Sequence, residues 1–143
     1  MASWIIPCNP RCYDVFSAFK KLKTVDWRQS AKSIDVGDTV YIYVGRPVQA
    51  IMYKTHVIAA GFPESEADNS DAEFNLRPIP ELKAERSDRL AMRLQIIKQY
   101  SPEDMTLEKM AQHGMKGNVM GPRRVDSGIQ ALIDTVELGA VRV

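Results

Sequence analysis

One of the two tryptophans in this 143-residue sequence lies among polar residues. Trp27 follows Asp26 and precedes Arg28, Gln29 and Ser30. A tryptophan that serves only packing usually lies in an apolar periodic run, where its large surface is covered on every side. The neighbours of Trp27 instead carry charges, an amide and a hydroxyl. We therefore expect the Trp27 side chain to serve more than packing, for example in contacting a ligand. A purely structural role in packing is the alternative.

Basic side chains gather in the same part of the sequence. Residues 1–60 hold eight Lys and Arg against four Asp and Glu, although the formal net charge of the whole chain is only +1. Any nucleic-acid surface must therefore be local. The candidates for phosphate contact in this stretch are Lys20, Lys21, Lys23, Arg28, Lys32 and Arg46. A solvated helix end is the alternative for each of them.

Two further arginines, Arg123 and Arg124, follow a glycine-punctuated loop at residues 114–122. The backbone of such a loop can approach a ligand closely, because glycine has no Cβ. A structural turn before a helix would have the same composition, so both interpretations stay open.

No pair of nucleophile and base is visible in the sequence. His56 lies in an apolar run and His113 near the expected end of a helix, with no serine or cysteine elbow beside either. Cys8 and Cys12 are the only cysteines, and without a second CxxC or a spaced histidine pair they fall short of a zinc site. We expect free thiols, no metal and no cofactor.

The elements that must position these side chains begin with an apolar strand at residues 4–6, which Pro7 is expected to end. Asp14 is suited to cap a helix in which apolar residues recur at helical spacing. Three of the basic candidates lie at the end of this helix, where cations interact favourably with the helix dipole.

A turn at residues 36–38 leads into a strand at 39–44, in which Tyr41 and Tyr43 share a face. The β-branched run at 51–58 predicts the next strand, antiparallel to the last.

The following segment changes character. Residues 61–80 lack periodicity and carry five acidic residues against one arginine, which predicts a surface loop or insertion extending to about residue 88. Alternation resumes at 90–97 and favours a long strand, with a helix as the alternative. Helix-start signals at 101–106 and at Asp126 predict two more helices.

The length fits one domain of residues 1–143 that can bury a core without metal or disulfide. No apolar run approaches the roughly 20 residues that span a bilayer, and the first residues lack a basic segment followed by a long apolar one. We expect no membrane partner and a cytoplasmic location. The oligomeric state is not predicted.

Four segments resemble, in this order, the EVE domain of the PUA-like superfamily. They are WIIPCNP at 4–10, DWRQS at 26–30, VGDTVYIYVG at 36–45 and GNVMGPRRV at 117–125. The resemblance implies an α+β fold, in which helices pack around a small, strongly bent or barrel-like β-sheet. It also implies a relation to the YTH domains, which read methylated adenine through an aromatic cage.

For the site, the resemblance implies a base-binding pocket whose wall is Trp27, so that the protein is a nucleic-acid-binding module for a flipped, modified base. Asn9, Gln29 and Ser30 would bond to the base edge, because a planar base has apolar faces and a rim of donors and acceptors. Of the two tyrosines, Tyr43 is our preferred lining residue. Trp4 is expected in the core with its edge within reach of the pocket. Which modified base is bound, and whether in DNA, in RNA or as a free nucleotide, stays open.

Two other functions remain possible from the sequence. Wider relatives of the resembled family hydrolyse modified nucleosides with Lys, Thr and Glu, so Lys54 and Thr55 allow a small amidohydrolase. Successive strand residues face opposite sides, however, which argues against these two acting together. A protein-interaction module that uses the acidic loop would need no base pocket.

Overall fold

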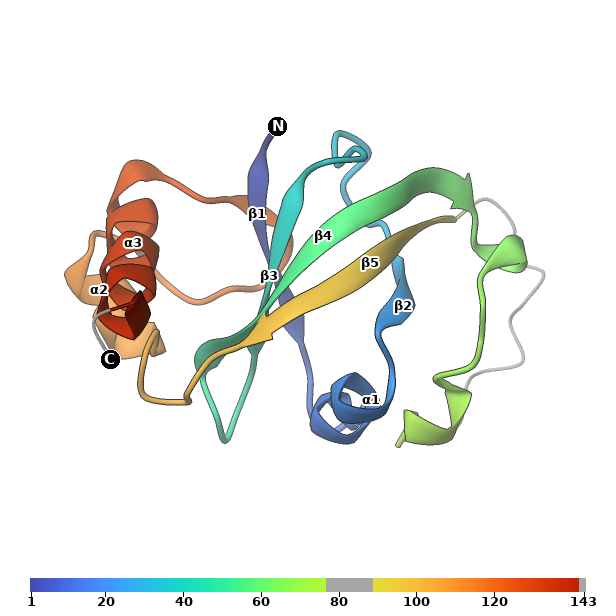
Figure 1. Ribbon diagram of the computed structural model, residues 1–143, viewed down its shortest axis with the longest axis horizontal. Helices are drawn as coiled ribbons and strands as arrows, with labels where there is room; N and C mark the ends of the chain where they lie inside the picture. The colour runs from blue at the N-terminus through green and yellow to red at the C-terminus, as the bar shows by residue number, and fades with distance from the viewer. Residues whose placement is uncertain (77–88, 142–143) are drawn as a thin grey trace.

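The computed structural model describes residues 1–76 and 89–141 and has a mixed six-stranded sheet with three helices (Figure 1). The strands are β1 (Ser3–Cys8), β2 (Thr24–Arg28), β3 (Thr39–Val44), β4 (Ala50–Pro63), β5 (Leu90–Gln99) and β6 (Arg123–Arg124). The helices are α1 (Val15–Lys21), α2 (Leu107–Gln112) and α3 (Ser127–Val141), and two short 3-10 helices are η1 (Glu64–Glu66) and η2 (Ala72–Phe74). The fold class is α+β, as expected.

The strand order in the sheet is β2-β5-β4-β3-β1-β6. β1 and β3 are parallel, and the other neighbouring strands are antiparallel. β2 and β6 are therefore the two edges. Register shifts interrupt the pairing of β4 with β3 and with β5, and such bulges bend a sheet. Figure 1 shows β4 and β5 as long ribbons that cross the molecule diagonally.

Alternation along the central strands divides the core into two clusters. Val40, Ile42 and Val44 of β3 belong to the cluster on the α1 side, whereas Tyr41 and Tyr43 belong to the cluster covered by α2 and α3. The two tyrosines therefore share a face, as the sequence predicts. In Figure 1, α2 and α3 lie together at one end of the molecule, away from α1 and the 3-10 helices.

The expected helix starts are confirmed by their caps. The carboxylate of Asp14 accepts a hydrogen bond from the amide of Ser17 at 3.3 Å, and that of Asp126 accepts from the amide of Ile129 at 2.9 Å. The hydroxyl of Thr106 caps α2 in the same way at 3.1 Å. Each cap satisfies an amide that has no partner inside its helix.

Two strand boundaries differ from the sequence prediction. β1 continues through Pro7 to Cys8, and residues 24–28 form a strand where the sequence suggested only a polar segment. β2 pairs with β5, with Trp27 opposite Met92. Charged side chains are frequent on edge strands, because they discourage pairing with other chains. The polar pattern around Trp27 therefore belongs in part to an edge strand.

The acidic insertion expected at about 61–88 is described only as far as residue 76. β4 extends to Pro63, and η1 and η2 follow it. The remainder of the expected insertion lies outside the described residues.

Candidate functional site

Trp27 lies half-buried on the α1 side of the sheet. Its ring makes edge contacts with Tyr13, at a centroid distance of 5.3 Å and an interplanar angle of 81°, and with Phe19, at 5.9 Å and 77°. Both angles are far from parallel, so neither ring stacks face to face on the indole. Phe19 comes from α1 and Tyr13 from the loop before it, so the first helix and the edge strand together form this aromatic group.

Gln29 has a structural role. Its side chain is buried, and its amide nitrogen donates to the carbonyl oxygens of Ala31 and Ile34 at 3.2 and 3.0 Å. Its amide oxygen accepts from the backbone N–H of Gly61 at 2.8 Å. Binding a base edge would require Gln29 to give up these bonds.

Asn9 and Ser30 are both exposed. The side-chain oxygen of Asn9 accepts a hydrogen bond from the backbone N–H of Arg11 at 2.9 Å, which stabilises the turn between β1 and α1. Ser30 follows Gln29 in the loop after β2. Of the three predicted polar contacts, Ser30 and the amide nitrogen of Asn9 therefore have the fewest internal partners among the described residues.

Tyr43 does not join this group. It is buried in the cluster on the α2 and α3 side, so the sheet separates it from Trp27. The expectation that Tyr43 and Trp27 line one pocket is wrong. The sequence predicts that Tyr41 and Tyr43 share a face of the strand, but it does not predict which helix covers that face. The Tyr43 hydroxyl is buried without a hydrogen-bond partner among the described residues.

Trp4 is a core residue, as expected. Its indole N–H donates to the buried carboxylate of Asp38 at 3.1 Å, and the guanidinium of Arg124 lies 4.9 Å from the ring centroid. Asp38 also accepts from the amides of Ala2 and Asp35. Burial opposes ionisation of Asp38, but these three hydrogen bonds outweigh it and hold its pKa below the ordinary value. The indole N–H of Trp4 is thus already hydrogen-bonded to the turn before β3.

The basic candidates divide by position. Five of them are exposed and lie on α1, on β2 or in the loops beside these elements: Lys20, Lys21, Lys23, Arg28 and Lys32. We call these five residues the basic rim. Within the part of the chain that the structure describes, only Lys21 of the five forms an ion pair, with Glu73 at 2.7 Å. Four of the five residues of the basic rim thus have no described carboxylate within ion-pair distance.

The other three basic candidates lie elsewhere. Arg46 is exposed in the loop between β3 and β4. Arg123 and Arg124 form β6, the edge of the sheet opposite to β2. Four strands separate β6 from β2, so these two arginines and Trp27 lie at opposite edges of the sheet.

An acidic segment packs beside the aromatic group. Tyr13 donates its hydroxyl proton to Asp71 at 2.8 Å. Burial raises the pKa of Asp71, and the charges of Asp26 and Asp68 add to that effect. Asp26 itself accepts two hydrogen bonds from Arg93, at 2.8 and 3.0 Å, in bidentate geometry. Carboxylates thus lie close to the ring that contacts Trp27.

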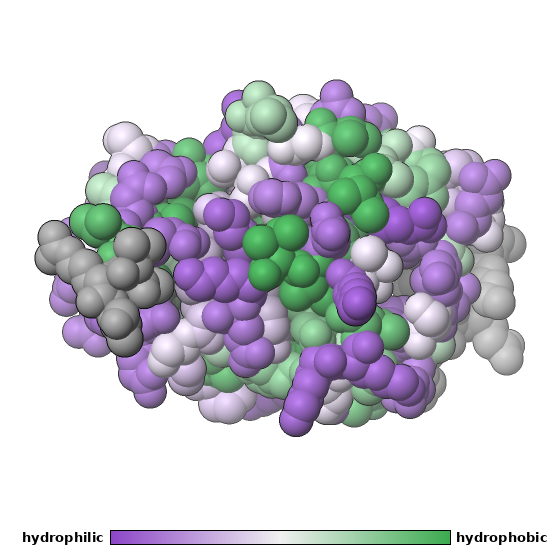
Figure 2. Space-filling view, viewed as in Figure 1, coloured by the Kyte–Doolittle hydropathy of each residue, from purple (hydrophilic) through white to green (hydrophobic). Residues whose placement is uncertain are grey.

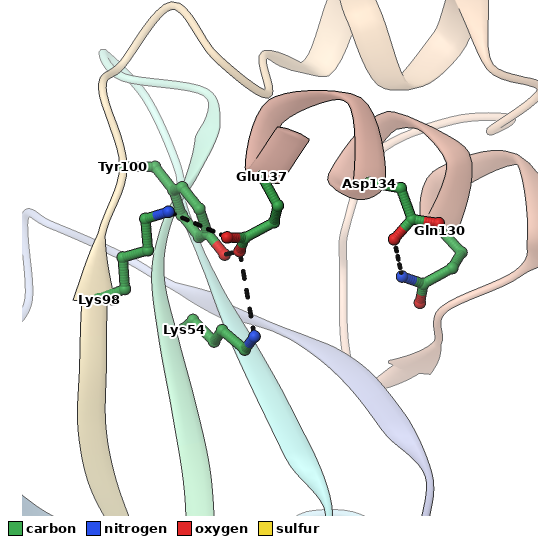
Figure 3. Close-up of polar contacts among 6 residues, drawn as sticks. All are labelled: Lys54, Lys98, Tyr100, Gln130, Asp134 and Glu137. Carbon is green, nitrogen blue, oxygen red and sulfur yellow. Dashed lines mark hydrogen bonds and ion pairs between the residues drawn. The ribbon is translucent and has the colours of Figure 1, made fainter. Parts of the chain in front are cut away.

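A second polar cluster lies on the opposite side of the sheet, and sequence reasoning missed it. Figure 3 shows Glu137 of α3 reaching toward β4 and β5. Its carboxylate accepts from the Tyr100 hydroxyl at 2.6 Å and from Lys98 at 3.0 Å, with Lys54 at 4.0 Å. The signal was absent from the sequence because Glu137 is 83 positions after Lys54 and on a different element.

The pKa values in this cluster follow from the same contacts. Burial opposes ionisation of Glu137, but the hydrogen bonds from Tyr100 and Lys98 and the charges of both lysines outweigh it, so its pKa lies below the ordinary value. Burial, then the charges of Glu137 and Asp134, raise the pKa of Tyr41 to about 12. Burial and the bond to Glu137 raise the pKa of Tyr100 as well. The carboxylate is therefore charged, and the phenols are neutral, at pH 7.

Lys54 and Thr55 face opposite sides, as the strand period predicts. Thr55 is buried and donates its hydroxyl to the carbonyl oxygen of Val40 at 2.8 Å, whereas Lys54 is half-exposed and points toward Glu137 (Figure 3). The two side chains therefore do not meet in one site. The acid that the sequence did not place near Lys54 is supplied by α3.

Two grooves lie away from Trp27. One, of about 540 Å³, runs over the open part of the sheet beside Thr39, His56, Ile58 and Gln95. The other, of about 360 Å³, lies between the end of β5 and α3. Neither groove is lined by a predicted pocket residue.

Figure 2 shows hydrophobic side chains gathered over the middle of the visible face, between hydrophilic ones.

The described residues give no sign of a metal centre or a membrane span. In residues 1–76 and 89–141, no three His, Cys, Asp or Glu side chains are grouped in a way that could hold a metal ion. No helix among them is long and apolar enough to cross a bilayer. Cys8 and Cys12 are free, and burial raises the pKa of the Cys8 thiol to about 12.

Comparison with known proteins shows the fold. No protein-family model and no curated protein sequence matches the chain. Among solved structures, ASCH from Zymomonas mobilis is similar with a TM-score of 0.63 and 10% identity, over 94% of both chains. A hypothetical protein from Leishmania major gives a TM-score of 0.67 at 14% identity, over 98% of this chain and 97% of that one.

Human THYN1, solved in complex with DNA containing 5-methylcytosine, is also similar. Its TM-score is 0.65 at 9% identity, and the match covers 96% of this chain and 97% of THYN1. At such identities a structural likeness establishes the fold alone. The chain therefore shares its α+β fold over nearly its whole length with these proteins.

Proposed function

We propose that this protein is an EVE-type nucleic-acid-binding module that accommodates a flipped, modified base against Trp27. The observation that carries the proposal is the half-buried indole of β2, since this strand, α1 and the loops that adjoin them also carry five exposed basic side chains. An aromatic face next to phosphate-binding cations is the usual combination for holding a base and its backbone together.

The aromatic geometry supports this assignment. Tyr13 and Phe19 meet Trp27 at angles near 80°, so they fix the indole without stacking on it. A base stacked on such a ring contributes about 1–3 kcal/mol. A methyl group on the base that fills an apolar corner adds about 1–3 kcal/mol of discrimination.

The basic rim supplies the second part of the proposal. Lys20, Lys23, Arg28 and Lys32 have no ion-pair partner among the described residues, so their charges are free to meet phosphates. Phosphate contacts add affinity that does not depend on sequence and that falls with salt. The fold shared with THYN1, a protein solved with methylated DNA, is consistent with the same ligand class here.

A fluorescence titration tests the proposal. Oligonucleotides of DNA and RNA that differ only in one base, plain, methylated or hydroxymethylated, are added to the wild-type protein. Stacking on Trp27 should quench its emission, and the Trp27→Phe variant, which keeps Trp4, should show little quenching. Tighter binding of one modified strand than of its plain counterpart is expected. Equal affinity for every base tested would sink the proposal.

A second candidate function rests on one observation, the approach of Glu137 to Lys54. A hydrolase of modified nucleosides needs a nucleophile or base together with an acid that protonates the leaving group. Lys54, Glu137 and Tyr100 lie within one cluster and could fill such roles (Figure 3). The alternative is a structural link that ties α3 to the sheet. We favour it because the carboxylate already accepts hydrogen bonds from Tyr100 and Lys98 and pairs with Lys54.

Mass spectrometry separates the two functions. The protein is incubated for hours with acylated and methylated nucleosides, with the Lys54→Ala variant alongside. We expect the nucleosides to stay intact with both proteins. Turnover that disappears in Lys54→Ala would instead favour the hydrolase.

A further inference from the structure

The segment at residues 68–76 packs against the two elements that carry Trp27 and the basic rim. We call this segment the acidic strap, because Asp68, Asp71 and Glu73 are its charged residues. Figure 1 shows η2, which lies within it, beside α1, and the two elements are in contact. The strap therefore brings carboxylates to a surface whose proposed ligand is itself an anion.

The strap contacts β2, the loop before α1, and α1 itself. The backbone N–H of Asp68 donates to Asp26 of β2 at 2.7 Å. Asp71 accepts from Tyr13, whose ring contacts Trp27. Glu73 pairs with Lys21 of α1. The Asp71 carboxylate therefore lies beside the ring that contacts Trp27, and the Glu73 carboxylate pairs with one lysine of the basic rim.

The strap is also anchored by contacts that do not involve Glu73. The amide of Asp14 donates to the carbonyl oxygen of Phe74 at 2.8 Å, and the amide of Leu76 donates to that of Cys12 at 2.9 Å. Phe74 packs against the core, and Lys21 lies 5.8 Å from its ring centroid. Main-chain bonds and a partly buried ring thus hold the strap together with the bond from Tyr13 to Asp71, so Glu73 is not needed to keep it in position.

The pair of Lys21 with Glu73 is easily opened. Both side chains are more than half exposed, at 61% and 57%. Exposed ion pairs contribute about 0–1 kcal/mol, so a phosphate can replace Glu73 at Lys21 at small cost. Of the five residues of the basic rim, only Lys21 forms an ion pair with a carboxylate among the described residues.

We propose that the acidic strap acts as an internal competitor of nucleic acid, with Glu73 occupying Lys21 in place of a phosphate. The proposal rests on the proposed function, since it concerns regulation of that site. Its consequence is that removing the charge of Glu73 strengthens binding and frees Lys21 to make one more phosphate contact.

A double-mutant cycle on binding tests the strap. Four proteins are compared by fluorescence anisotropy with one labelled single-stranded oligonucleotide: wild type, Glu73→Gln, Lys21→Gln and the double variant. Glu73→Gln should tighten binding about two- to fivefold, the value of one exposed charge pair. It should also steepen the dependence of log affinity on log salt by about 0.7, one extra phosphate contact on a single strand.

The cycle also predicts how Lys21 behaves in each background. Lys21→Gln should change binding less than twofold in the wild type, where Glu73 holds the lysine, and weaken it about two- to fivefold in Glu73→Gln. Glu108→Gln is the matched control, because it removes the same charge from an exposed site on α2, at the other end of the molecule. A melting curve for each variant verifies folding.

Two failures are distinguishable. If the wild type binds and Glu73→Gln binds no better than Glu108→Gln, the competitor proposal is overturned while the proposed function survives. Equal losses on Lys21→Gln in both backgrounds would overturn it in the same way. If none of the proteins binds any oligonucleotide, the proposed function fails and the competitor proposal fails with it.

Discussion

The two sides of the sheet both carry lysines near aromatic rings, but they use them differently. On the α3 side, Lys54 and Lys98 converge on Glu137, and Tyr100 completes the shell around that carboxylate. On the α1 side, Lys20 and Lys23 face water with no described carboxylate within ion-pair distance. The lysines of the α3 side are paired with a carboxylate inside the fold. Lys20 and Lys23 on the α1 side have no such partner among the described residues, so a ligand can contact them.

The aromatic residues differ in the same way. Tyr41, Tyr43 and Tyr100 are enclosed between the sheet and the helices that cover it. Trp27 is only half-buried, and its ring neighbours touch it at steep angles. Ligand binding needs accessible groups whose position is fixed by others, and the α1 side provides that combination. A nucleic-acid surface is therefore expected at α1 and β2.

The largest expected effect is that of Trp27→Ala. Removing the indole leaves space beside Tyr13 and Phe19, and truncating a buried aromatic costs about 3–5 kcal/mol, so a half-buried one should cost about 2–3 kcal/mol of unfolding free energy. If the proposed function holds, binding of the preferred oligonucleotide should also weaken by about 1–3 kcal/mol. Urea unfolding and titration measure the two effects.

Trp27→Phe separates packing from stacking. It keeps an aromatic ring against Tyr13 and Phe19, so stability should recover most of the loss while base stacking recovers less. A variant that regains both stability and full affinity would mean that the indole itself makes no special contact with the ligand.

The next largest effect concerns the opposite side. Glu137→Ala leaves Tyr100 and two lysines without their shared acceptor, and loss of such bonds costs about 1–3 kcal/mol. We expect a decrease of about 2 kcal/mol in urea unfolding and no change in oligonucleotide affinity, because α3 lies away from Trp27. Asp134→Ala is the control, since Asp134 is exposed on the same helix and bonds only to Gln130 in Figure 3. If the folded Glu137→Ala variant bound the oligonucleotide more weakly than the wild type, binding would not be confined to the α1 side.

A smaller effect is expected in the pH dependence of stability. Because the folded state lowers the pKa of Glu137, its charge stabilises the fold at pH values above the ordinary glutamate pKa of 4.5, and this contribution is lost as the pH falls below it. The side chain is 33% exposed, so the contribution is at most about 1 kcal/mol. The stability difference between wild type and Glu137→Gln should shrink from pH 6 to pH 3. A constant difference would contradict a charged role for Glu137.

Local signals in the sequence were enough for most of the helices and strands. The caps at Asp14 and Asp126 and the alternation in β3 were all predicted, since each depends on residues a few positions apart. β2 was missed because an edge strand needs only one buried face, and its charged residues concealed the strand pattern.

The site was harder to predict, because it depends on contacts between distant segments. Polar neighbours marked Trp27, but nothing local indicated that Gln29 is buried and bonded to Gly61, 32 positions away. Likewise, the face that Tyr43 occupies is decided by the placement of α2 and α3. Residue type thus predicted candidates, and only tertiary packing determined which of them remain accessible.

The smallest expected effect tests whether the free lysines of the α1 side matter at all. Lys23 is exposed between α1 and β2 and forms no ion pair with a described residue, so Lys23→Gln should change the unfolding free energy by less than about 0.5 kcal/mol. If Lys23 contacts a phosphate, the slope of log affinity against log salt should decrease by about 0.7 on a single strand, equally for modified and plain bases. Lys116→Gln, an exposed lysine in the loop before α3, is the matched control and should leave the slope unchanged. Equal slopes for both variants would remove Lys23 from the phosphate surface, whereas a change in base preference at constant slope would mean that Lys23 contacts the base rather than the backbone.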